Sequence, residues 1–326
     1  MKCTNKIFTV FLVVALTVCL TGCSSDVEVK NPYSVYEDSY SLGLILNAPK
    51  SNSNLMSSSI CVTNGEDYLT DQVDSSVAGG AGVFNMDTRE VLYAQNVLGK
   101  LYPASTTKIL TAYVAIKYGD LEQQITVSEN ACKQASDSSV CKLNPGDVLT
   151  LRQLLYGLML RSGNDAAVAI AEGISGDVDT FVALMNEEAA RIGASHSHFV
   201  TPNGLHDEDH YTTIYDMYLI TNEALKYNDF VEIMQTSNYD VYYTDRAGNA
   251  KQQSWANTCG YLSGQKKAPE GINVIGGKTG TTFDAGYCLV CYSVNERNEH
   301  LISIVYKADG RANLYYLMNQ ILAFGK

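Results

Sequence analysis

The sequence predicts an α+β domain in which an antiparallel sheet is covered by helices and an insertion forms an all-helical lobe. Three observations support this prediction. A hairpin pattern occupies residues 81–94, helical spacing dominates residues 151–227, and three extended segments followed by an amphipathic helix close the chain. The helical stretch between the two sets of strands is expected to form the lobe.

The first residues indicate export. Lys2 and Lys6 precede an apolar run over residues 7–20, which is too short to span a bilayer comfortably and is typical of a signal peptide. The run ends in Leu20-Thr21-Gly22-Cys23, which resembles the lipobox of bacterial lipoproteins. We therefore expect residues 1–22 to be removed and Cys23 to carry lipid that anchors the protein outside the cytoplasm; the alternative is an ordinary signal peptide with an incidental cysteine.

The remaining chain divides into a lead-in and one large domain. Residues 23–76 are rich in Ser, Asn, Asp and Tyr and predict a tether, while residues 77–326 are long enough for a substantial core. The formal net charge of the whole chain is −12. This acidic balance argues against a nucleic-acid partner, which would require a basic surface.

Six cysteines lie beyond the predicted lipidation site, and an exported protein can pair them. Cys132 and Cys141 bracket a short polar loop and are the favoured pair, whereas Cys288 and Cys291 would point to opposite faces of one strand. No spacing matches a tetrahedral zinc site, so a structural or reduced role is expected for all six.

The elements follow in order along the chain. Residues 81–85 and 91–94 flank a turn-like segment and predict a hairpin. Pro103 introduces a helix whose first turn contains Ser105, with one buried stripe at Ile109, Ala112, Tyr113 and Ile116. Helical spacing then marks residues 151–160, 165–172, 180–192 and 213–227, extended patterns mark 272–281, 286–294 and 300–307, and a last helix covers 312–323.

Three short motifs occur in order: Ser105-Thr106-Thr107-Lys108, Ser162-Gly163-Asn164 and Lys278-Thr279-Gly280. Two of them also occur elsewhere, for example as Ser-x-x-Lys at residues 139–142 and 263–266. Context separates the copies, because only the Ser105 copy opens a predicted helix and only the Ser162 copy joins two helices. This set, with Asp in the middle motif, is known from penicillin-binding proteins and serine β-lactamases.

The motif residues have the chemistry of an activated serine. A serine in the first turn of a helix lies at the positive end of the helix dipole, and a lysine three residues later can reach its hydroxyl. Burial of Lys108 near a second cation, Lys278, would lower its pKa and make it a base. Ser162 could then pass a proton to the leaving amine.

The other motif positions suit a peptide substrate. Asn164 offers both a donor and an acceptor to a substrate amide, and Lys278 would attract a C-terminal carboxylate. Gly280 has no side chain, so a peptide could pair with the strand, and the backbone N–H groups of Ser105 and Thr281 would form an oxyanion hole.

The chain from about residue 77 to its end resembles the low-molecular-mass D-alanyl-D-alanine carboxypeptidases, which are penicillin-binding proteins of peptidase family S11. The resemblance rests on the three motifs and their contexts, on residues 203–207, and on Ala285-Gly286-Tyr287. It implies the β-lactamase and transpeptidase type of fold and a serine D,D-carboxypeptidase that removes the terminal D-alanine of cell-wall stem peptides through a Ser105 acyl-enzyme. It also implies inhibition by β-lactams, no cofactor and no metal. By the same resemblance, Thr279 and Thr281 contact substrate and Arg311 lies near its carboxylate.

Departures and alternatives remain beside this interpretation. Many family members continue into a second domain and a C-terminal membrane-binding helix, whereas this chain stops at Lys326, so a lipid on Cys23 would replace that anchor. The site could also serve a D,D-endopeptidase, a β-lactamase or a catalytically silent penicillin sensor, although the Glu-x-x-Leu-Asn segment of one β-lactamase class is missing. His206 and His210 have the spacing of zinc ligands, but they follow a turn signature and predict a loop bordering the cleft.

Overall fold

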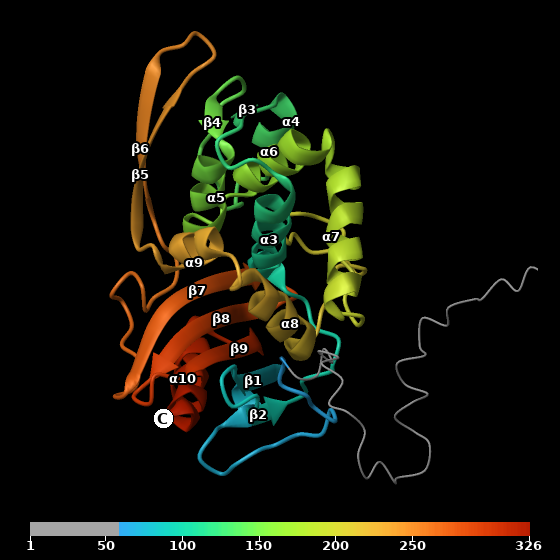
Figure 1. Ribbon diagram of the computed structural model, residues 1–326, viewed down its shortest axis with the longest axis vertical. Coiled ribbons are helices and arrows are strands. Elements are labelled where there is room, and N and C mark those ends of the chain that lie inside the picture. The colour runs from blue at the N-terminus through green and yellow to red at the C-terminus, as the bar shows by residue number, and fades with distance from the viewer. Residues whose placement is uncertain (1–58) are drawn as a thin grey trace, which may run out of the picture. The chain divides into compact units, whose positions relative to one another are not determined.

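A five-stranded antiparallel sheet forms the centre of the domain. The computed structural model describes residues 59–326. The strands lie in the order β2-β1-β9-β8-β7, so the hairpin near the start of the domain pairs with the last strand of the chain (Figure 1). Their bounds are β1 Gly80–Asn85, β2 Val91–Gln95, β7 Ile272–Thr282, β8 Gly286–Asn295 and β9 His300–Ala308.

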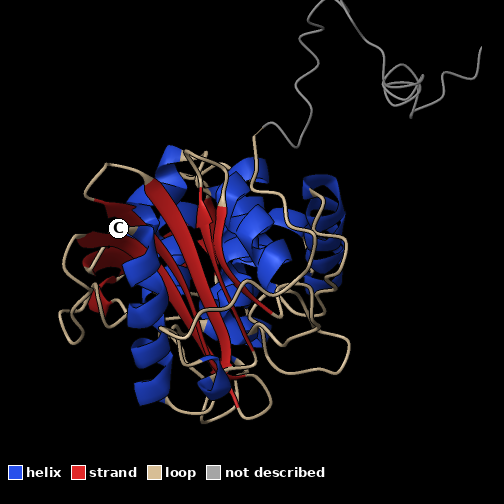
Figure 2. Cartoon of the chain, turned by 90° about the horizontal axis from the view of Figure 1, so that it is seen from below, coloured by secondary structure: helices blue, strands red, loops and turns tan. Residues whose placement is uncertain are grey.

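Each face of this sheet is buried against helices (Figure 2). Alternate side chains of β8 belong to different cores: Cys288 and Val290 pack toward the helical lobe, while Leu289 and Cys291 pack toward α10 (Arg311–Leu322). This period of two is the geometry of a strand. It confirms that Cys288 and Cys291 point to opposite faces.

The helical lobe surrounds α3 (Lys108–Tyr118), whose first eight residues are all buried. Two helix ends are fixed by local contacts: Thr150 and Gln153 form a capping box at the start of α5, and Gly193 ends α7 in the left-handed conformation. The other helices are α4 Glu129–Cys132, α5 Leu151–Leu160, α6 Asn164–Ser175, α7 Val178–Ile192, α8 Ile214–Ala224 and α9 Asn228–Gln235.

A second sheet, in the order β3-β4-β5-β6, lies beside the lobe. Its long hairpin, labelled β5 and β6 in Figure 1, pairs Asn238 with Ala256 at its base and Thr244 with Ala250 near its tip. Tyr239 stacks on Tyr156 of α5 and holds the hairpin to the lobe. The bounds are β3 Gln124–Thr126, β4 Val148–Thr150, β5 Asn238–Thr244 and β6 Ala250–Ala256.

The structure confirms the predicted fold class and most predicted elements, with three corrections. The serine turn is a 3-10 turn, Ala104–Thr107, that precedes α3. The helix predicted over residues 213–227 ends at Ala224, and α9 follows as a separate helix. The folded part begins before residue 77, because Cys61 is already buried and its N–H donates to the hydroxyl of Tyr218.

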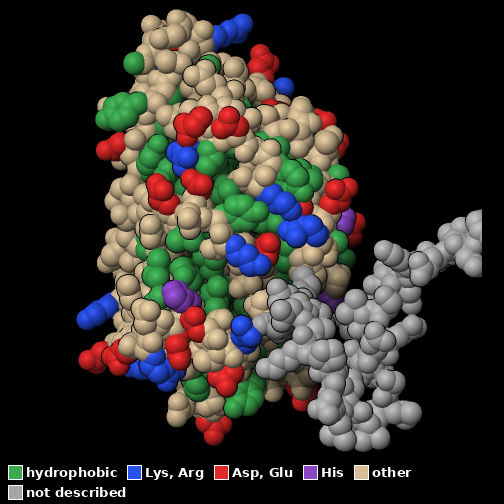
Figure 3. Space-filling model, in the orientation of Figure 1, with side chains coloured by type: hydrophobic (Ala, Val, Ile, Leu, Met, Phe, Trp, Pro, Cys, Tyr) green, Lys and Arg blue, Asp and Glu red, His purple; other side chains and the backbone are tan. Residues whose placement is uncertain are grey.

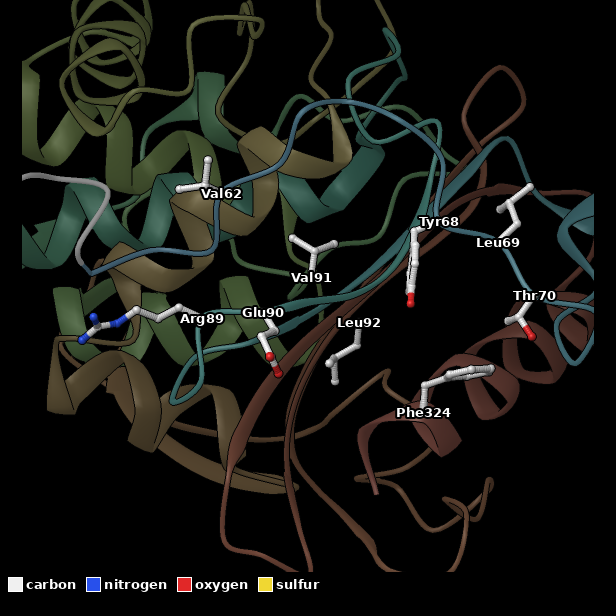
Figure 4. Close-up of a pocket in the computed structure, with 9 residues that line it drawn as sticks. All are labelled: Val62, Tyr68, Leu69, Thr70, Arg89, Glu90, Val91, Leu92 and Phe324. Carbon is white, nitrogen blue, oxygen red and sulfur yellow. The ribbon is translucent and has the colours of Figure 1, made fainter. Parts of the chain in front are cut away.

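Residues 62–70 run along the outer sheet edge formed by β2. Figure 4 shows the shallow groove that they form with Arg89, Glu90 and Phe324. In the strand order, β2 is the edge farthest from β7, so this groove lies away from the strand that carries the third motif. Among residues 59–326, no helix combines the length and apolarity needed to cross a bilayer.

The six cysteines in the described residues are free thiols. The predicted pairing of Cys132 with Cys141 is not formed, because each thiol packs in a different direction. Cys132 donates to the carbonyl of Leu143 at 3.3 Å, whereas the sulfur of Cys141 fills the space beside Gly157 and Gly163.

Candidate active site

The Ser105 turn is held in an unusual backbone conformation. Ala104 has φ 47°, in the left-handed region that a residue with a Cβ rarely adopts. Its carbonyl accepts a hydrogen bond from the Thr107 hydroxyl at 2.8 Å, and the Thr106 hydroxyl donates to the Pro103 carbonyl at 2.7 Å. Such strain concentrates at functional sites, where the surroundings hold it in place.

Lys108 lies directly beneath the serine, with its ammonium nitrogen 3.0 Å from Ser105 Oγ. The same nitrogen lies 2.8 Å from Asn164 Oδ1 and 2.6 Å from the Asn203 carbonyl oxygen, both of which can only accept hydrogen bonds. Burial, and then the positive charge of Lys278, hold the pKa of Lys108 well below its usual range. A neutral amine fits these partners, because its two N–H groups serve the two oxygens and its lone pair faces the Ser105 hydroxyl.

Ser162 and Lys278 form the second contact between motifs. Ser162 follows α5 with φ 58°, and its Oγ accepts a hydrogen bond from Lys278 Nζ at 2.9 Å. Lys278 also donates to the carbonyl of Thr279 at 2.8 Å and is completely buried. Burial lowers the pKa of Lys278 to about 7.

These contacts bring the three motifs together in one place. Lys108 joins the first motif to Asn164 of the second, and Lys278 of the third motif joins Ser162. Ser105, Asn164 and Thr281 line one cleft. An adjoining pocket, which shares Thr281 with that cleft, is lined by the remaining predicted contact residues, Thr279 and Arg311.

The hydrogen bonds of Lys278 go to protein atoms. Its nitrogen faces Ser162 and the Thr279 carbonyl, and the contact with a substrate carboxylate stays a prediction. The charged side chains that line the adjoining pocket are those of Arg161 and Arg311, and none of the described residues lining it is acidic.

Two glycines permit close packing around the nucleophile. A Cβ at Gly280 would lie 2.9 Å from the Ser105 nitrogen and 2.9 Å from the Pro103 carbonyl, so only glycine lets β7 approach the serine turn this closely. A Cβ at Gly204 would overlap the carbonyl oxygen of Ala104. The structure thus assigns Gly280 a packing role in addition to the strand pairing predicted for it.

His210 supports the serine turn, which sequence reasoning did not predict. Its Nδ1 accepts hydrogen bonds from the backbone of Val200 and Thr201 at 3.0 Å and 3.3 Å, and its Nε2 lies 2.8 Å from Thr107 Oγ1. Burial lowers the pKa of His210 to about 4, so the ring is neutral near pH 7. The accepting Nδ1 requires the proton on Nε2, which then donates to Thr107.

His206 has a different partner from His210, and the two do not form a metal site. Its ring packs edge-on against Tyr102, and its Nε2 lies 3.6 Å from Asp284. Within residues 59–326, no group of three or more His, Cys, Asp or Glu side chains is arranged to hold a metal ion. Cys23, the predicted lipidation site, lies outside the described residues.

Two further contacts at the site were absent from the sequence prediction. Ser139 lies in a Ser-x-x-Lys copy that context excludes as the nucleophile, yet its carbonyl accepts the Asn164 N–H at 2.8 Å and it lines the cleft. The Thr258 hydroxyl lies 2.8 Å from that of Thr279. Their signal is weak in the sequence, since one acts through its backbone and the other belongs to no motif.

Comparison with known proteins agrees with this geometry. Residues 68–310 match the family model of peptidase S11, described as D-alanyl-D-alanine carboxypeptidase. The D-alanyl-D-alanine carboxypeptidase DacF of Bacillus subtilis is 34% identical over 237 residues, covering 71% of this chain and 58% of DacF. The D-alanyl-D-alanine carboxypeptidase of a Streptomyces species is 34% identical over 224 residues, covering 65% of this chain and 75% of that protein.

A solved structure extends the likeness to the fold. The crystal structure of the Streptomyces K15 DD-transpeptidase superimposes with a TM-score of 0.71 at 30% identity, covering 76% of this chain and 97% of that chain. The chain spans between half and three fifths of the length of curated relatives such as DacF, at 58%, and the DacA protein of Haemophilus influenzae, at 53%. The match over most of the chain, together with the converging motifs, shows that this chain belongs to peptidase family S11, the D-alanyl-D-alanine carboxypeptidase family.

Proposed function

We propose that this protein is a serine D,D-carboxypeptidase that removes the terminal D-alanine from peptidoglycan stem peptides and is acylated by β-lactams at Ser105. The observation that carries the proposal is the buried Lys108 amine, 3.0 Å from Ser105 Oγ and held by two oxygens that can only accept hydrogen bonds. This arrangement supports a neutral lysine that acts as the base for the serine.

In the first step the Ser105 hydroxyl gives its proton to Lys108 and its Oγ attacks the carbonyl carbon of the scissile peptide bond. The backbone N–H groups of Ser105 and Thr281 are proposed to stabilise the resulting oxyanion, with each donor contributing about 3 kcal/mol. Both residues line the same cleft, which supports this assignment.

The leaving amine needs a proton, and Ser162 is the proposed donor. Its hydroxyl is bonded to Lys278 at 2.9 Å, so the proton can be replaced from a lysine whose pKa is about 7. When the amine is protonated, the C–N bond breaks and D-alanine leaves. Water then hydrolyses the Ser105 ester and regenerates the enzyme.

The cleft and the adjoining pocket suit a D-alanine terminus. Arg311, with Thr279 and Thr281, is proposed to bind the terminal carboxylate, and Lys278 adds its charge. Asn164 Oδ1 accepts a hydrogen bond from Lys108, which leaves the amide N–H groups of Asn164 for the peptide backbone of the substrate. On the face drawn in Figure 3, basic side chains are interspersed with acidic ones.

We further propose that the enzyme works outside the cytoplasm and is held to the membrane by lipid on Cys23. The charged start, the apolar run over residues 7–20 and the Leu20-Thr21-Gly22-Cys23 sequence support this location. In cells labelled with radioactive palmitate, the protein should carry label and sediment with membranes. The Cys23→Ser variant should lose the label; retention of the label would contradict the anchor.

The activity is tested by measuring D-alanine released from a synthetic stem peptide ending in D-Ala-D-Ala. We expect release by the natural protein, none by Ser105→Ala, and a fall of at least about 100-fold in Lys108→Met, since general bases contribute this much or more. A peptide ending in D-Ala-L-Ala serves as the substrate control.

Ser263→Ala is the matched control variant, because Ser263 opens another Ser-x-x-Lys copy and lies outside the cleft. It should retain full activity. D-alanine release that survives in Ser105→Ala, or that Ser263→Ala abolishes, would refute the assignment of the nucleophile.

A further inference from the structure

Two buried cysteines pack behind the strand that carries Lys278. Cys259 and Cys291 are both 0% exposed and belong to the core between the sheet and α10. Cys291 lies on β8, and Cys259 lies in the segment that leads from β6 toward β7. Neither residue takes part in the proposed catalytic mechanism.

Gly277 brings the two thiols together. In the sheet register Gly277 is the direct partner of Cys291, and a Cβ at Gly277 would lie 2.7 Å from the sulfur of Cys259. The Cys259 thiol therefore occupies the place of a side chain opposite Cys291. Side chains in such cross-strand pairs have their Cβ atoms about 4.5–5.5 Å apart, so a sulfur in that place is within reach of the Cys291 thiol.

The thiols also interact with each other. A hydrogen bond with Cys291 lowers the pKa of the Cys259 thiol, whereas burial, together with the same bond, raises the pKa of Cys291.

The other described thiols face backbone oxygens. Cys61 donates to the carbonyl of Asn85 at 3.2 Å, Cys132 to that of Leu143 at 3.3 Å, and Cys288 to that of Ala285 at 3.5 Å. Cys141 is enclosed beside Gly157 and Gly163. Cys259 differs from these thiols, because its sulfur occupies the side-chain place of Gly277, the direct strand partner of Cys291.

We propose that Cys259 and Cys291 form an intramolecular disulfide as the protein folds outside the cytoplasm. One of the two thiolates attacks the disulfide of an exported thiol oxidant and forms a mixed disulfide, and the other then displaces the oxidant. The two thiols lose two protons and two electrons, and the oxidant's disulfide is reduced to two thiols. Because both sulfurs are completely buried in the final fold, this exchange takes place before the core closes.

The disulfide would stabilise one wall of the cleft on the side of the sheet that faces α10. Next to Cys259, the Thr258 hydroxyl bonds to that of Thr279, and the Thr258 N–H donates to the carbonyl of Leu160 at 3.1 Å. Gly260 N–H donates to the hydroxyl of Tyr315 on α10 at 2.7 Å. The cross-link would add stability to this wall without touching the reacting atoms.

The test maps thiols in the full chain refolded with reduced and oxidised glutathione. Free thiols are blocked with N-ethylmaleimide after denaturation, and the digested protein is analysed by mass spectrometry. We expect one linked peptide pair, containing Cys259 and Cys291, and alkylation of the other described cysteines. Alkylation of both Cys259 and Cys291, or linkage of either to another cysteine, would overturn the proposal.

Stability measurements give a second readout. The urea midpoint of the oxidised protein should fall when dithiothreitol is added, and it should fall equally in Cys288→Ser, whose thiol is equally buried but faces a carbonyl. The urea midpoint of Cys291→Ser should not change when dithiothreitol is added. If Cys291→Ser does not fold, Cys259→Ala is used in its place. If dithiothreitol left the urea midpoint of the natural protein unchanged, the cross-link would be contradicted.

The inference rests on the proposed function only through the extracytoplasmic location. Benzylpenicillin acylation is therefore measured on the same refolded samples. A disulfide without acylation would refute the proposed activity and leave the cross-link standing, whereas acylation with two free thiols would do the reverse.

Discussion

Removing the buried charge of Lys278 should stabilise the fold at pH 6 and destabilise it at pH 9. Burial lowers the pKa of this lysine from 10.5 to about 7, and the side chain is completely buried. Between these two values the unfolded chain holds a proton that the folded chain has released. The contribution of Lys278 to stability therefore rises with pH over this interval and is least favourable below pH 7.

The magnitude follows from the same two values. At about 1.4 kcal/mol per pH unit, burying Lys278 costs about 5 kcal/mol at pH 6, where it is charged, and about 2 kcal/mol at pH 9, where the folded chain must release its proton. Its two hydrogen bonds, to Ser162 and to the Thr279 carbonyl, offset about 3 kcal/mol. Lys278→Met should thus raise the free energy of unfolding by about 2 kcal/mol at pH 6 and lower it by about 1 kcal/mol at pH 9.

Urea unfolding followed by circular dichroism at both pH values measures this difference. The matched control is Lys267→Met, which removes an exposed lysine just before β7 and should change stability equally at both pH values. If the stability difference between Lys278→Met and the natural protein were the same at pH 6 and pH 9, burial of charge would not be its cause.

Three further changes test the packing and binding around the nucleophile. A residue with a Cβ in the left-handed backbone conformation costs about 1–2 kcal/mol. Gly204→Ala should lower the free energy of unfolding, measured in urea, by more than this, because its Cβ would overlap the Ala104 carbonyl. Gly248→Ala, at φ 83° with open space around it, should show only the backbone cost; equal losses in both variants would rule out the overlap. His210→Phe should slow acylation about 10-fold when benzylpenicillin is saturating, which corresponds to about 1.4 kcal/mol in the activation free energy. Stopped-flow kinetics measures this rate, and an unchanged rate would show that His210 does not position the serine turn. Arg311→Ala should raise KM about 10-fold for a peptide with a free terminal carboxylate and leave KM unchanged for the same peptide ending in an amide; equal effects on both would remove Arg311 from carboxylate binding.

Local sequence signals predicted much of the fold. The hairpin of β1 and β2 and the helical spacing of α5 depend on neighbouring residues, so their patterns are visible in short windows. The sequence does not predict the β5 and β6 hairpin, because the inner face of β6 is mostly polar: Lys251 and Gln253 share it with Trp255. Residues 59–76 were assigned to the lead-in because the contact that buries Cys61 lies 157 residues away, at Tyr218.

The candidate site divides in the same way. Ser105, Lys108, Ser162 and Lys278 could be predicted because their chemistry requires those residue types in short motifs. The Asn203 carbonyl that accepts a hydrogen bond from Lys108 could not be predicted, because every residue type has a backbone carbonyl. His210 has the side chain of a zinc ligand, and its bond to Thr107 depends on a contact across 103 residues.

The central claim is that the Lys108 amine activates Ser105 as the nucleophile. The most direct test is intact-mass spectrometry of the protein incubated with benzylpenicillin, followed by peptide mapping of the adduct. We predict one stable penicilloyl group on the peptide containing Ser105, no adduct on Ser105→Ala, and greatly slowed labelling of Lys108→Met. An adduct on another residue, or labelling of Ser105 at an undiminished rate in Lys108→Met, would contradict the account.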